Sequence, residues 1–324
     1  MKVHEVVAMS NTVSNAINES LDEILKKDKR AVLLGEDLST GGIFNISKGL
    51  YEKYGKSRII DLPVGENTSL GIAIGMAMEG FHPIVEIMYA DFLFLALDNI
   101  WMHLSQLPIV SKDKINLPVI IRVPYGSGNG DGYQHNASLY SLAFLIPNIF
   151  VFIPSNPYEF KQIFNIAHDL KKPSFIFEHR SLYNIEFKDE NKKIKFGKAD
   201  LVTEGNDISI VGAGLMVNVA LKAIKKLKIK ADLINPLSLN PLDLDTIALS
   251  VKKTKKLLII DDELSLQSYG NYIISSLLSK YHLEFKAEIL GYESLPLPYN
   301  IKKEKISMPN ENKIIKIINK MLKN

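Results

Sequence analysis

The chain has 324 residues, of which 46% are hydrophobic, and its 39 basic and 36 acidic side chains leave a formal net charge of +3. This length corresponds to about two domains, each with enough apolar residues for a core. The balanced charge does not indicate nucleic acid as a partner, and the lack of cysteine excludes disulfides, thiolate metal ligands and cysteine nucleophiles. No apolar run approaches the roughly 20 residues of a membrane-spanning helix, and the amino-terminal segment predicts an amphipathic helix rather than a signal peptide. We therefore expect a cytoplasmic protein without membrane partners.

Apolar strands alternate with helical periods in the first part of the chain. The first helix is predicted after an N-cap at Ser10-Asn11, because Val13, Ile17 and Leu21 recur on one face. Strands are predicted, mostly with helical stretches between them, at Ala31–Leu34, Ile84–Tyr89, Val119–Val123, Ile149–Ile153 and Phe175–Glu178. This alternation indicates a parallel sheet covered by helices on both faces.

The alternation restarts beyond a charged segment. Residues 186–200 are poor in apolar side chains and predict a linker between a first domain at 1–185 and a smaller domain at 201–324. Strands of the second domain are predicted at Ile208–Val211, Ala231–Ile234, Leu257–Ile260 and Ala287–Leu290, and a last helix near Lys313–Met321 is expected to pack on their sheet. The predicted fold class is α/β with two parallel-sheet domains.

A helix of small residues follows Glu66. The segment from residue 68 to Gly80 predicts a helix ended by glycine, and Gly71 and Gly75 give it a face that another backbone can approach closely. From composition alone, the more common role would be a helix packed within its own domain, with Glu66 favoured by the helix dipole.

Two further side chains follow predicted strands. Phe92 comes after the strand at Ile84–Tyr89, near the carboxyl edge where open α/β sheets bind ligands, although most phenylalanines at such junctions belong to the core. The glycine-rich loop 125–135 follows the strand at Val119–Val123 and ends in His135. Glycines there permit unusual backbone angles or a close ligand, and such loops often serve a site. A single histidine is nevertheless more often structural than catalytic.

Taken in order, these segments resemble the beta subunit of thiamine-dependent 2-oxoacid dehydrogenases, which include the pyruvate, branched-chain and acetoin dehydrogenases. The resemblance extends from about residue 3 to 300, and it is carried, in family order and spacing, by the blocks RIIDLPVGEN, GIAIGMAMEGFHPIVEIMYADF, PVIIRVPYGSG, GYQH, PNIFVFIPSNPYE, KKPSFIFEHRSLY, INPLSLNPLD and VKKTKKLLIIDDE. It implies a transketolase-like pyrimidine-binding domain followed by a transketolase C-terminal-like domain. It also implies oxidative decarboxylation of a 2-oxoacid, with acyl transfer to a lipoyl group.

The resemblance assigns roles to three residues. Glu66 matches the glutamate that hydrogen-bonds N1′ of the thiamine aminopyrimidine, where a carboxyl group stabilises the imino tautomer whose 4′ nitrogen removes the thiazolium C2 proton. Phe92 matches the aromatic residue that packs on the pyrimidine. His135 matches the histidine at the reaction centre, which donates a proton or hydrogen bond to a substrate-derived oxygen and helps acyl transfer.

The implied cofactors are thiamine diphosphate, magnesium and, in some family members, potassium. Gly130-Asp131-Gly132 imitates the start of the diphosphate and magnesium motif, but no Asn-Asn pair follows about 25–30 residues later. We therefore expect a partner subunit to hold magnesium and the diphosphate. It would resemble the alpha subunit, form a heterotetramer with this chain, and feed a lipoyl-bearing acyltransferase. The family's potassium, bound through backbone carbonyls, would lie at the positions that match its ligands, Val119, Ala167, Leu170 and Lys172.

Some positions depart from the family pattern. The chain has Gly65-Glu66 where Ser-Glu is frequent, and His135-Asn136-Ala137 where His-Ser-Gln is frequent. Residues 232–239 lack the arginine usual in the second domain, and residues 211–214 match only part of a dinucleotide fingerprint, for which tight strand-to-helix packing is the better account. The sequence therefore does not choose the 2-oxoacid.

Two other functions remain open. A separately encoded C-terminal half of a transketolase-like enzyme would transfer two-carbon ketol units, and its sugar phosphates should call for basic residues, of which Arg122 and Arg180 lie nearest the motifs. A non-catalytic regulatory or scaffold subunit would keep the fold without the chemistry. The presence of Glu66, Phe92 and His135 together argues against that second alternative.

Overall fold

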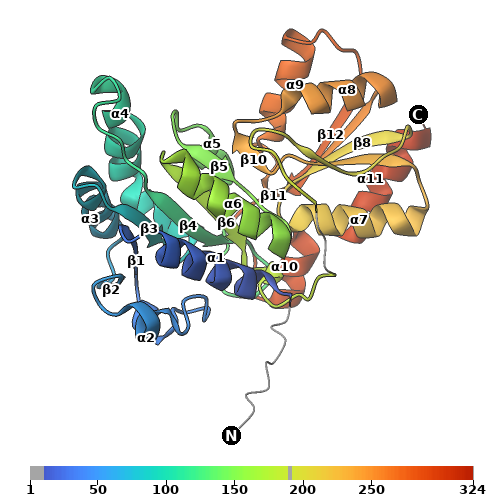
Figure 1. Cartoon of the computed structure of the whole chain (residues 1–324). Helices are drawn as coiled ribbons and strands as arrows, with labels where there is room; N and C mark the ends of the chain where they lie inside the picture. Colours follow the sequence, from blue (N-terminus) through green and yellow to red (C-terminus); the bar gives the residue numbers. More distant parts are fainter. Residues whose placement is uncertain (1–10, 189–191, 324) are drawn as a thin grey trace, which may run out of the picture.

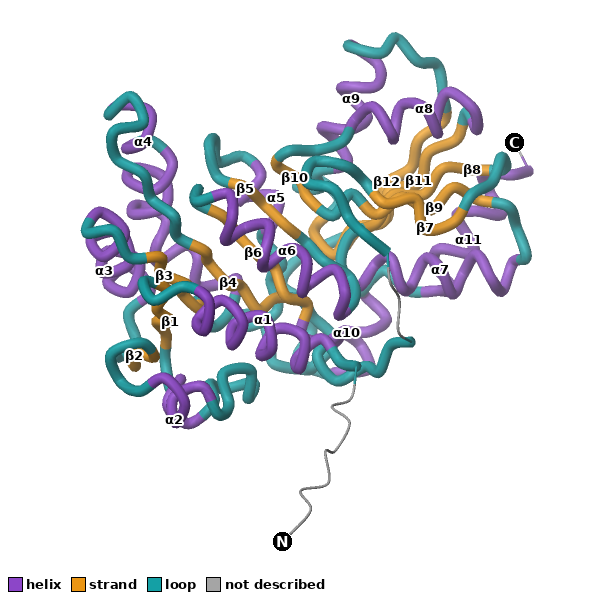
Figure 2. The backbone as a smooth tube through the Cα atoms, viewed as in Figure 1, coloured by secondary structure: helices purple, strands orange, loops and turns teal. Residues whose placement is uncertain are grey.

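The computed structural model describes residues 11–188 and 192–323. Two α/β lobes lie side by side, each with a sheet between layers of helices (Figure 1). Figure 2 shows the strands as two separate groups with the helices outside them. The two lobes are joined by more than the linker, because one hydrophobic cluster contains Val85 of the first sheet and Ile259 of the second.

The first sheet has the strand order β10-β5-β6-β4-β3-β1-β2, and all its neighbours are parallel except the edge strand β10. The strands are β1 (Ala31–Gly35), β2 (Ile59–Asp61), β3 (His82–Glu86), β4 (Ile120–Tyr125), β5 (Phe150–Phe152), β6 (Ser174–His179) and β10 (Ser238–Asn240). The central strands β1, β3, β4 and β6 are buried along their whole length, as expected for a sheet with both faces covered.

Helices cover both faces of the first sheet. On one face α1 (Val13–Lys27) lies beside α6 (Pro157–Leu170), and both bury residues in one cluster (Figure 1). The other face carries α3, two irregular helices and two short helices; the bounds are α3 (Glu66–Met78), η2 (Ala90–Ala96), η3 (Asn99–Ser105), α4 (Leu107–Val110) and α5 (Tyr140–Phe144). The remaining short elements are η1 (Leu38–Thr40), α2 (Leu50–Tyr54) and η4 (Arg180–Leu182).

The second sheet has the order β12-β11-β8-β9-β7, with β7 antiparallel at its edge. Its strands are β7 (Asp200–Thr203), β8 (Ile208–Gly212), β9 (Ala231–Asn235), β11 (Lys256–Leu264) and β12 (Lys286–Tyr292). The helices around it are α7 (Leu215–Leu227), α8 (Leu244–Thr254), α9 (Gly270–Ser279) and α11 (Glu311–Lys323). Helix α10 (Ile301–Ser307) instead contacts the loop after β4 of the first sheet through Glu304. As predicted, the last helix packs on this sheet, because Ile314, Ile318 and Met321 join its core cluster.

The structure confirms the two-sheet α/β fold and corrects details of it. Helix α1 is capped by Thr12, whose hydroxyl accepts a hydrogen bond from the Asn15 N–H at 3.3 Å, whereas Ser10 of the predicted cap lies outside the described residues. Strand β3 ends at Glu86 and not at Tyr89, because the chain turns into η2. The short strands β2, β7 and β10 were not predicted. Each of these strands has only three or four residues and no continuous apolar run, so its sequence shows too little periodicity to predict a strand.

The division of the chain at residues 186–200 stays a prediction. The structure adds that β7 begins at Asp200 and that β10, from the second half, pairs antiparallel with β5 of the first sheet. Within the described ranges no single helix is long and apolar enough to cross a membrane; only the bent pair Ala90–Ala96 and Asn99–Val110, at 73° to each other, reaches that length and composition together.

Candidate active site

The carboxyl edge of the first sheet gathers the three predicted site residues. Parallel strands end at the same edge, so the segments after β2, β3 and β4 emerge together. These segments lead to Glu66 at the start of α3, to Phe92 in η2 and to the glycine-rich loop that ends in His135. Helix α3 also packs against η2, which connects Glu66 to the segment that carries Phe92.

Glu66 is a buried carboxylate at a helix N-terminus. Its residue is 6% exposed, and among the described residues its carboxylate makes no side-chain hydrogen bond. Burial and then the nearby charge of Glu66 raise the pKa of Glu36, which accepts a hydrogen bond from the Gly65 N–H. Two carboxyl groups therefore face a common region. A buried carboxylate normally has a partner, so this arrangement suits a ligand that offers a hydrogen-bond donor.

Phe92 and His135 are in ring contact. Their centroids lie 5.5 Å apart at an interplanar angle of 79°, and the Tyr89 ring lies 4.6 Å from His135 and 5.7 Å from Phe92. These edge-to-face contacts join the segments that follow two strands, because Tyr89 and Phe92 follow β3 and His135 follows β4. The imidazole is thus oriented by aromatic neighbours and stays partly exposed.

Arg180 holds the glycine-rich loop in place. Its Nη2 donates to the carbonyl oxygens of Gly126 and His135, at 2.5 and 2.6 Å, and its Nη1 donates to Asp131. The carbon of the guanidinium lies 4.9 Å from the centre of the Tyr89 ring. One buried arginine therefore fixes both ends of the loop and the tyrosine beside His135.

Asp91 provides a second tie on the loop. Its carboxylate accepts a hydrogen bond from the Ala137 N–H at 3.1 Å. Burial raises the pKa of Asp91, while that hydrogen bond and the charge near His135 act in the opposite direction. The carbonyl of His135 and the N–H of Ala137 are consequently bound to side chains that follow β6 and β3.

The second domain supports the same loop from outside. Glu304 of α10 is fully buried and accepts hydrogen bonds from the Gly130 N–H at 2.8 Å and from Nδ2 of Asn136 at 3.4 Å. A Cβ at Gly132 would lie 2.1 Å from the Tyr299 ring, and the φ of Gly132 is +82°. The positive φ favours glycine at this position, and any larger residue would also force the exposed Tyr299 ring to move.

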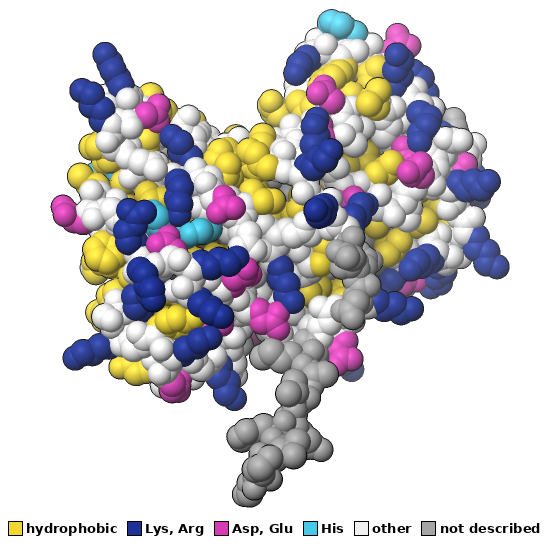
Figure 3. Space-filling view, viewed as in Figure 1, with side chains coloured by type: hydrophobic (Ala, Val, Ile, Leu, Met, Phe, Trp, Pro, Cys, Tyr) yellow, Lys and Arg dark blue, Asp and Glu magenta, His cyan; other side chains and the backbone are white. Residues whose placement is uncertain are grey.

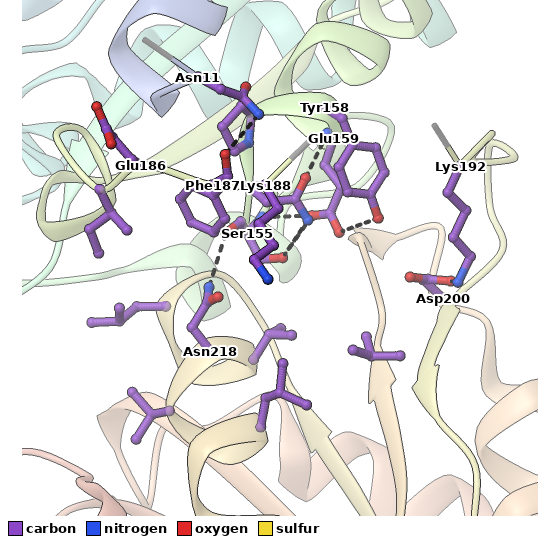
Figure 4. A pocket seen from close by; sticks show the side chains of 18 of the residues that line it. Asn11, Ser155, Tyr158, Glu159, Glu186, Phe187, Lys188, Lys192, Asp200 and Asn218 are labelled. Carbon is purple, nitrogen blue, oxygen red and sulfur yellow. Dashed lines mark hydrogen bonds and ion pairs between the residues drawn. The ribbon is translucent and has the colours of Figure 1, made fainter. Parts of the chain in front are cut away.

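A cavity of about 380 Å³ opens beside the loop. It is lined by Phe44, Asn45, Tyr89, Asn129, Asp131, Arg180, Tyr183 and Asn184. A different cavity of about 570 Å³ lies between the domains, and Figure 4 shows Tyr158, Glu159, Lys192 and Asn218 around it. None of the three predicted site residues lines either cavity, although Tyr89 and Arg180 of the first contact His135. In the interdomain cavity the Glu159 carboxylate is bound to Ser155 and Asn235.

The two arginines nearest the motifs have structural roles. Arg122 is fully buried and donates to Glu86 and Glu178, so it does not face a substrate. Arg180 binds mainly loop carbonyls. The Gly130-Asp131-Gly132 stretch also proves to be part of the loop framework, because Asp131 pairs with Arg180.

Sequence reasoning did not single out Tyr89, Asp91 or Glu36. Tyr89 and Asp91 stand beside Phe92 in the same block, and their position just past a strand was the available signal. Glu36 follows β1 in the same way. The role of Arg180 depends on the pairing of Tyr125 with His179 across β4 and β6, which no local pattern reveals.

The predicted potassium positions lie at the opposite edge of the sheet. Val119 precedes β4, Ala167 and Leu170 belong to the end of α6, and Lys172 precedes β6. The carbonyl oxygen of Val119 accepts from the Ser174 N–H at 3.0 Å, and that of Lys172 accepts from the Ser174 hydroxyl at 3.1 Å. Potassium binding at these carbonyls stays a prediction.

Comparisons with known proteins agree with this architecture. The model of the transketolase pyrimidine-binding domain matches residues 10–186, and that of the transketolase C-terminal domain matches residues 197–314. A solved structure described as a split gene transketolase, inactive beta4 tetramer, superposes with a TM-score of 0.78 over 97% of this chain and 99% of the other. At 21% identity it supports the fold alone.

Curated relatives define the family more narrowly. The chain is 34% identical to the pyruvate dehydrogenase E1 component subunit beta of Chaetosphaeridium globosum, covering 95% of this chain and 97% of the relative. It is 31% identical to two Bacillus subtilis proteins, the acetoin:2,6-dichlorophenolindophenol oxidoreductase subunit beta, with 96% and 97% covered, and the 2-oxoisovalerate dehydrogenase subunit beta, with 93% and 95% covered. The chain therefore belongs to the family of E1 beta subunits of 2-oxoacid and acetoin dehydrogenases. This family uses thiamine diphosphate, and its beta subunits function with alpha subunits.

Proposed function

We propose that this chain is the beta subunit of a heteromeric 2-oxoacid dehydrogenase and supplies the pyrimidine-facing half of a thiamine diphosphate site. The observation that carries the proposal is the Glu66 carboxylate, which is buried at the start of α3 and makes no side-chain hydrogen bond within the described part of the chain. A neutral or cationic donor such as the protonated N1′ of an aminopyrimidine would satisfy it.

The residues at this edge fit that cofactor. When bound, thiamine diphosphate supplies a carbon nucleophile for decarboxylation of the 2-oxoacid. Glu66 holds the proton at N1′, and Phe92 gives an aromatic surface for the pyrimidine. His135, held against Tyr89 and Phe92, donates a hydrogen bond or proton to the oxygen that develops charge on the substrate. Arg180 keeps the backbone of His135 in position.

A partner of the alpha type would complete the site and bring the groups that hold magnesium and the diphosphate. Support comes from an apolar surface on α3, η2, η3 and α4, which is made of Ile72, Met78, Phe94, Leu95, Trp101, Met102, Ile109 and Val110. Each of these side chains is at least 38% exposed. Gly71 and Gly75 leave the outward side of α3 flat, so another backbone can approach Ile72 closely.

Three further parts belong to the same proposal. The acyl group would pass to a lipoyl-bearing acyltransferase, potassium would bind at the backbone carbonyls of Val119, Ala167, Leu170 and Lys172, and the enzyme would work in the cytoplasm. Pyruvate, branched-chain 2-oxoacids and acetoin remain alternatives as substrates. Relatives named for each of them are 31–34% identical to this chain.

Ketol transfer by a transketolase-like enzyme is the second candidate, and the structure gives it less support. Sugar phosphates call for several basic residues, yet Arg122 is enclosed in ion pairs. Arg180 does line the cavity beside the loop, but it already binds the loop backbone and Asp131. Figure 3 shows the lysines and arginines of one face spread over both domains rather than gathered at a cleft.

Mild affinity purification of the chain from its native cell, followed by mass spectrometry, tests the proposal. We expect a thiamine-binding alpha-type subunit together with a lipoylated acyltransferase. A Trp101→Glu, Met102→Glu variant should lose the alpha-type subunit, and the control Leu145→Glu, also on an exposed apolar side chain, should keep it. Recovery of a transketolase-type amino-terminal half instead would contradict the dehydrogenase function.

A further inference from the structure

Three metal-ligand side chains meet at the amino edge of the first sheet, opposite the candidate active site. Asp28 caps the end of α1, His82 begins β3, and His168 lies in the last turn of α6. Their ligand atoms, Oδ2 of Asp28, Nδ1 of His82 and Nε2 of His168, all lie within 4.8 Å of one another. Three elements that are far apart in the sequence therefore bring two imidazoles and a carboxylate to one point.

The spacing of these atoms suits a tetrahedral metal ion. Zinc binds imidazole nitrogen and carboxylate oxygen at about 2.0–2.2 Å, which places neighbouring ligand atoms roughly 3.3 Å apart. Nε2 of His168 lies 3.2 Å from Oδ2 of Asp28, close to that spacing. Nδ1 of His82 is in closer hydrogen-bond contact with the same oxygen, and these two atoms would move apart as the ion enters. The side chains are 9 to 15% exposed, so the point is sheltered but open to ions.

A cation already lies among these three atoms. The Lys171 ammonium is 3.1 Å from Nδ1 of His82, 3.2 Å from Nε2 of His168 and 3.5 Å from Oδ2 of Asp28. The Lys171 side chain is 35% exposed, so it can turn outward when another cation arrives.

We propose that Asp28, His82 and His168 form a binding site for a divalent transition-metal ion of the zinc type, which displaces the Lys171 ammonium from its centre. The ion takes two imidazole nitrogens and one carboxylate oxygen from the chain, and water completes the tetrahedron. Bound there, it joins α1, β3 and α6 on the side of the sheet away from Glu66. The site uses side chains only, so it differs from the carbonyl positions predicted for potassium.

Zinc titration of the purified, chelator-treated full-length chain tests the proposal. Calorimetry with ZnCl₂ in a buffer that contains excess Mg²⁺ and K⁺ should give one tight site per chain. His168→Gln and the double variant His82→Asn, His168→Gln should weaken binding at least 100-fold, whereas the control His282→Gln, on an exposed histidine of the second domain, should not change it. Thermal unfolding of each variant without metal shows whether it is folded.

The Lys171→Ala variant distinguishes a metal site from a cluster that serves only the structure. Loss of the competing ammonium should tighten zinc binding, about tenfold. Absence of a site in the parent chain, equal affinity in the parent and His168→Gln, or weaker binding in Lys171→Ala would each overturn the proposal. Since the readout is zinc affinity alone, it stands or falls independently of thiamine-dependent activity.

Discussion

The two edges of the first sheet treat buried polar groups in opposite ways. At the amino edge Asp28, His82 and His168 converge on the Lys171 ammonium, so every charge has a partner within the chain. At the carboxyl edge Glu66 is as well buried but has no side-chain partner in the described residues. Burial alone therefore does not distinguish a ligand site from a group that is satisfied within the chain. The Glu66 carboxylate is left able to accept a hydrogen bond from a ligand, whereas an ion at the amino edge has to displace the Lys171 ammonium.

Glu66→Gln should have the largest effect on function. The amide cannot hold the N1′ proton as the carboxylate does, so we expect the turnover of the assembled enzyme to fall on the order of 10²–10⁴-fold. The melting temperature should stay close to that of the parent, because no side-chain partner is lost within the described chain. Glu79→Gln, on an exposed carboxylate just past the end of the same helix, is the matched control. Turnover near the parent rate in Glu66→Gln would remove the proposed role.

Arg122→Met should instead affect stability. The substitution leaves Glu86 and Glu178 buried without their common cation, and breaking such a group typically costs about 3–5 kcal/mol. Chemical denaturation measures the free energy of unfolding, and Arg30→Met on an exposed arginine serves as control. If the free energy of unfolding fell by less than about 1 kcal/mol, the ion pairs of Arg122 with Glu86 and Glu178 would contribute little to stability.

Glu159→Gln extends the comparison to a buried carboxylate between the domains. Burial raises the pKa of Glu159 to about 7, although hydrogen bonds from Ser155 and Asn235 act against this. A raised folded pKa means that the folded state binds the proton more tightly, so stability should fall as the pH rises from about 4.5 to 7, by roughly 3 kcal/mol. The Glu159→Gln variant has no ionisable group at this position, so its stability should not show this pH dependence.

The measurement is the unfolding free energy of parent and Glu159→Gln at pH 5 and pH 8. We expect the variant to gain stability relative to the parent as the pH rises, and Glu284→Gln, on an exposed carboxylate, to track the parent. An equal difference between parent and Glu159→Gln at both pH values would mean that this carboxylate is ionised at little cost.

Gly132→Ala should have the smallest of the four effects. The φ of Gly132 is +82°, and an added Cβ would also lie 2.1 Å from Tyr299. Gly49 has the same φ of +82° but has no atom within 4 Å of an added Cβ, so Gly49→Ala isolates the backbone strain, about 1 kcal/mol. We expect Gly132→Ala to cost about 1 kcal/mol more. Equal losses would show that the Tyr299 ring moves aside at little cost and does not constrain the loop at Gly132.

Local patterns were sufficient for much of this architecture. Strands β1 and β8 occur where continuous apolar runs predicted them, and α3 ends before Gly80, which has a φ of +87°. Family resemblance, rather than periodicity, singled out Glu66, Phe92 and His135. The structure brings the last two into contact and places Glu66 at the same edge.

What could not be predicted depends on long-range pairing. Arg180 reaches the carbonyl of His135 only because β6 lies next to β4, and Glu304 reaches Gly130 only because α10 folds back onto the first domain. Strand β10 is short and crosses to the first sheet, so neither its length nor its position was visible locally. Periodicity describes one element at a time, and these contacts join elements that are far apart in the chain.

Exchange of the C2 proton of bound thiamine diphosphate for deuterium measures directly whether Glu66 activates the cofactor. The assembled complex with parent chain should exchange this proton rapidly, and the complex with Glu66→Gln should exchange it at least 100-fold more slowly while it still binds the cofactor. Glu79→Gln should match the parent. Exchange at the parent rate in the Glu66→Gln complex would contradict the claim that the unpartnered carboxylate at the start of α3 activates the cofactor.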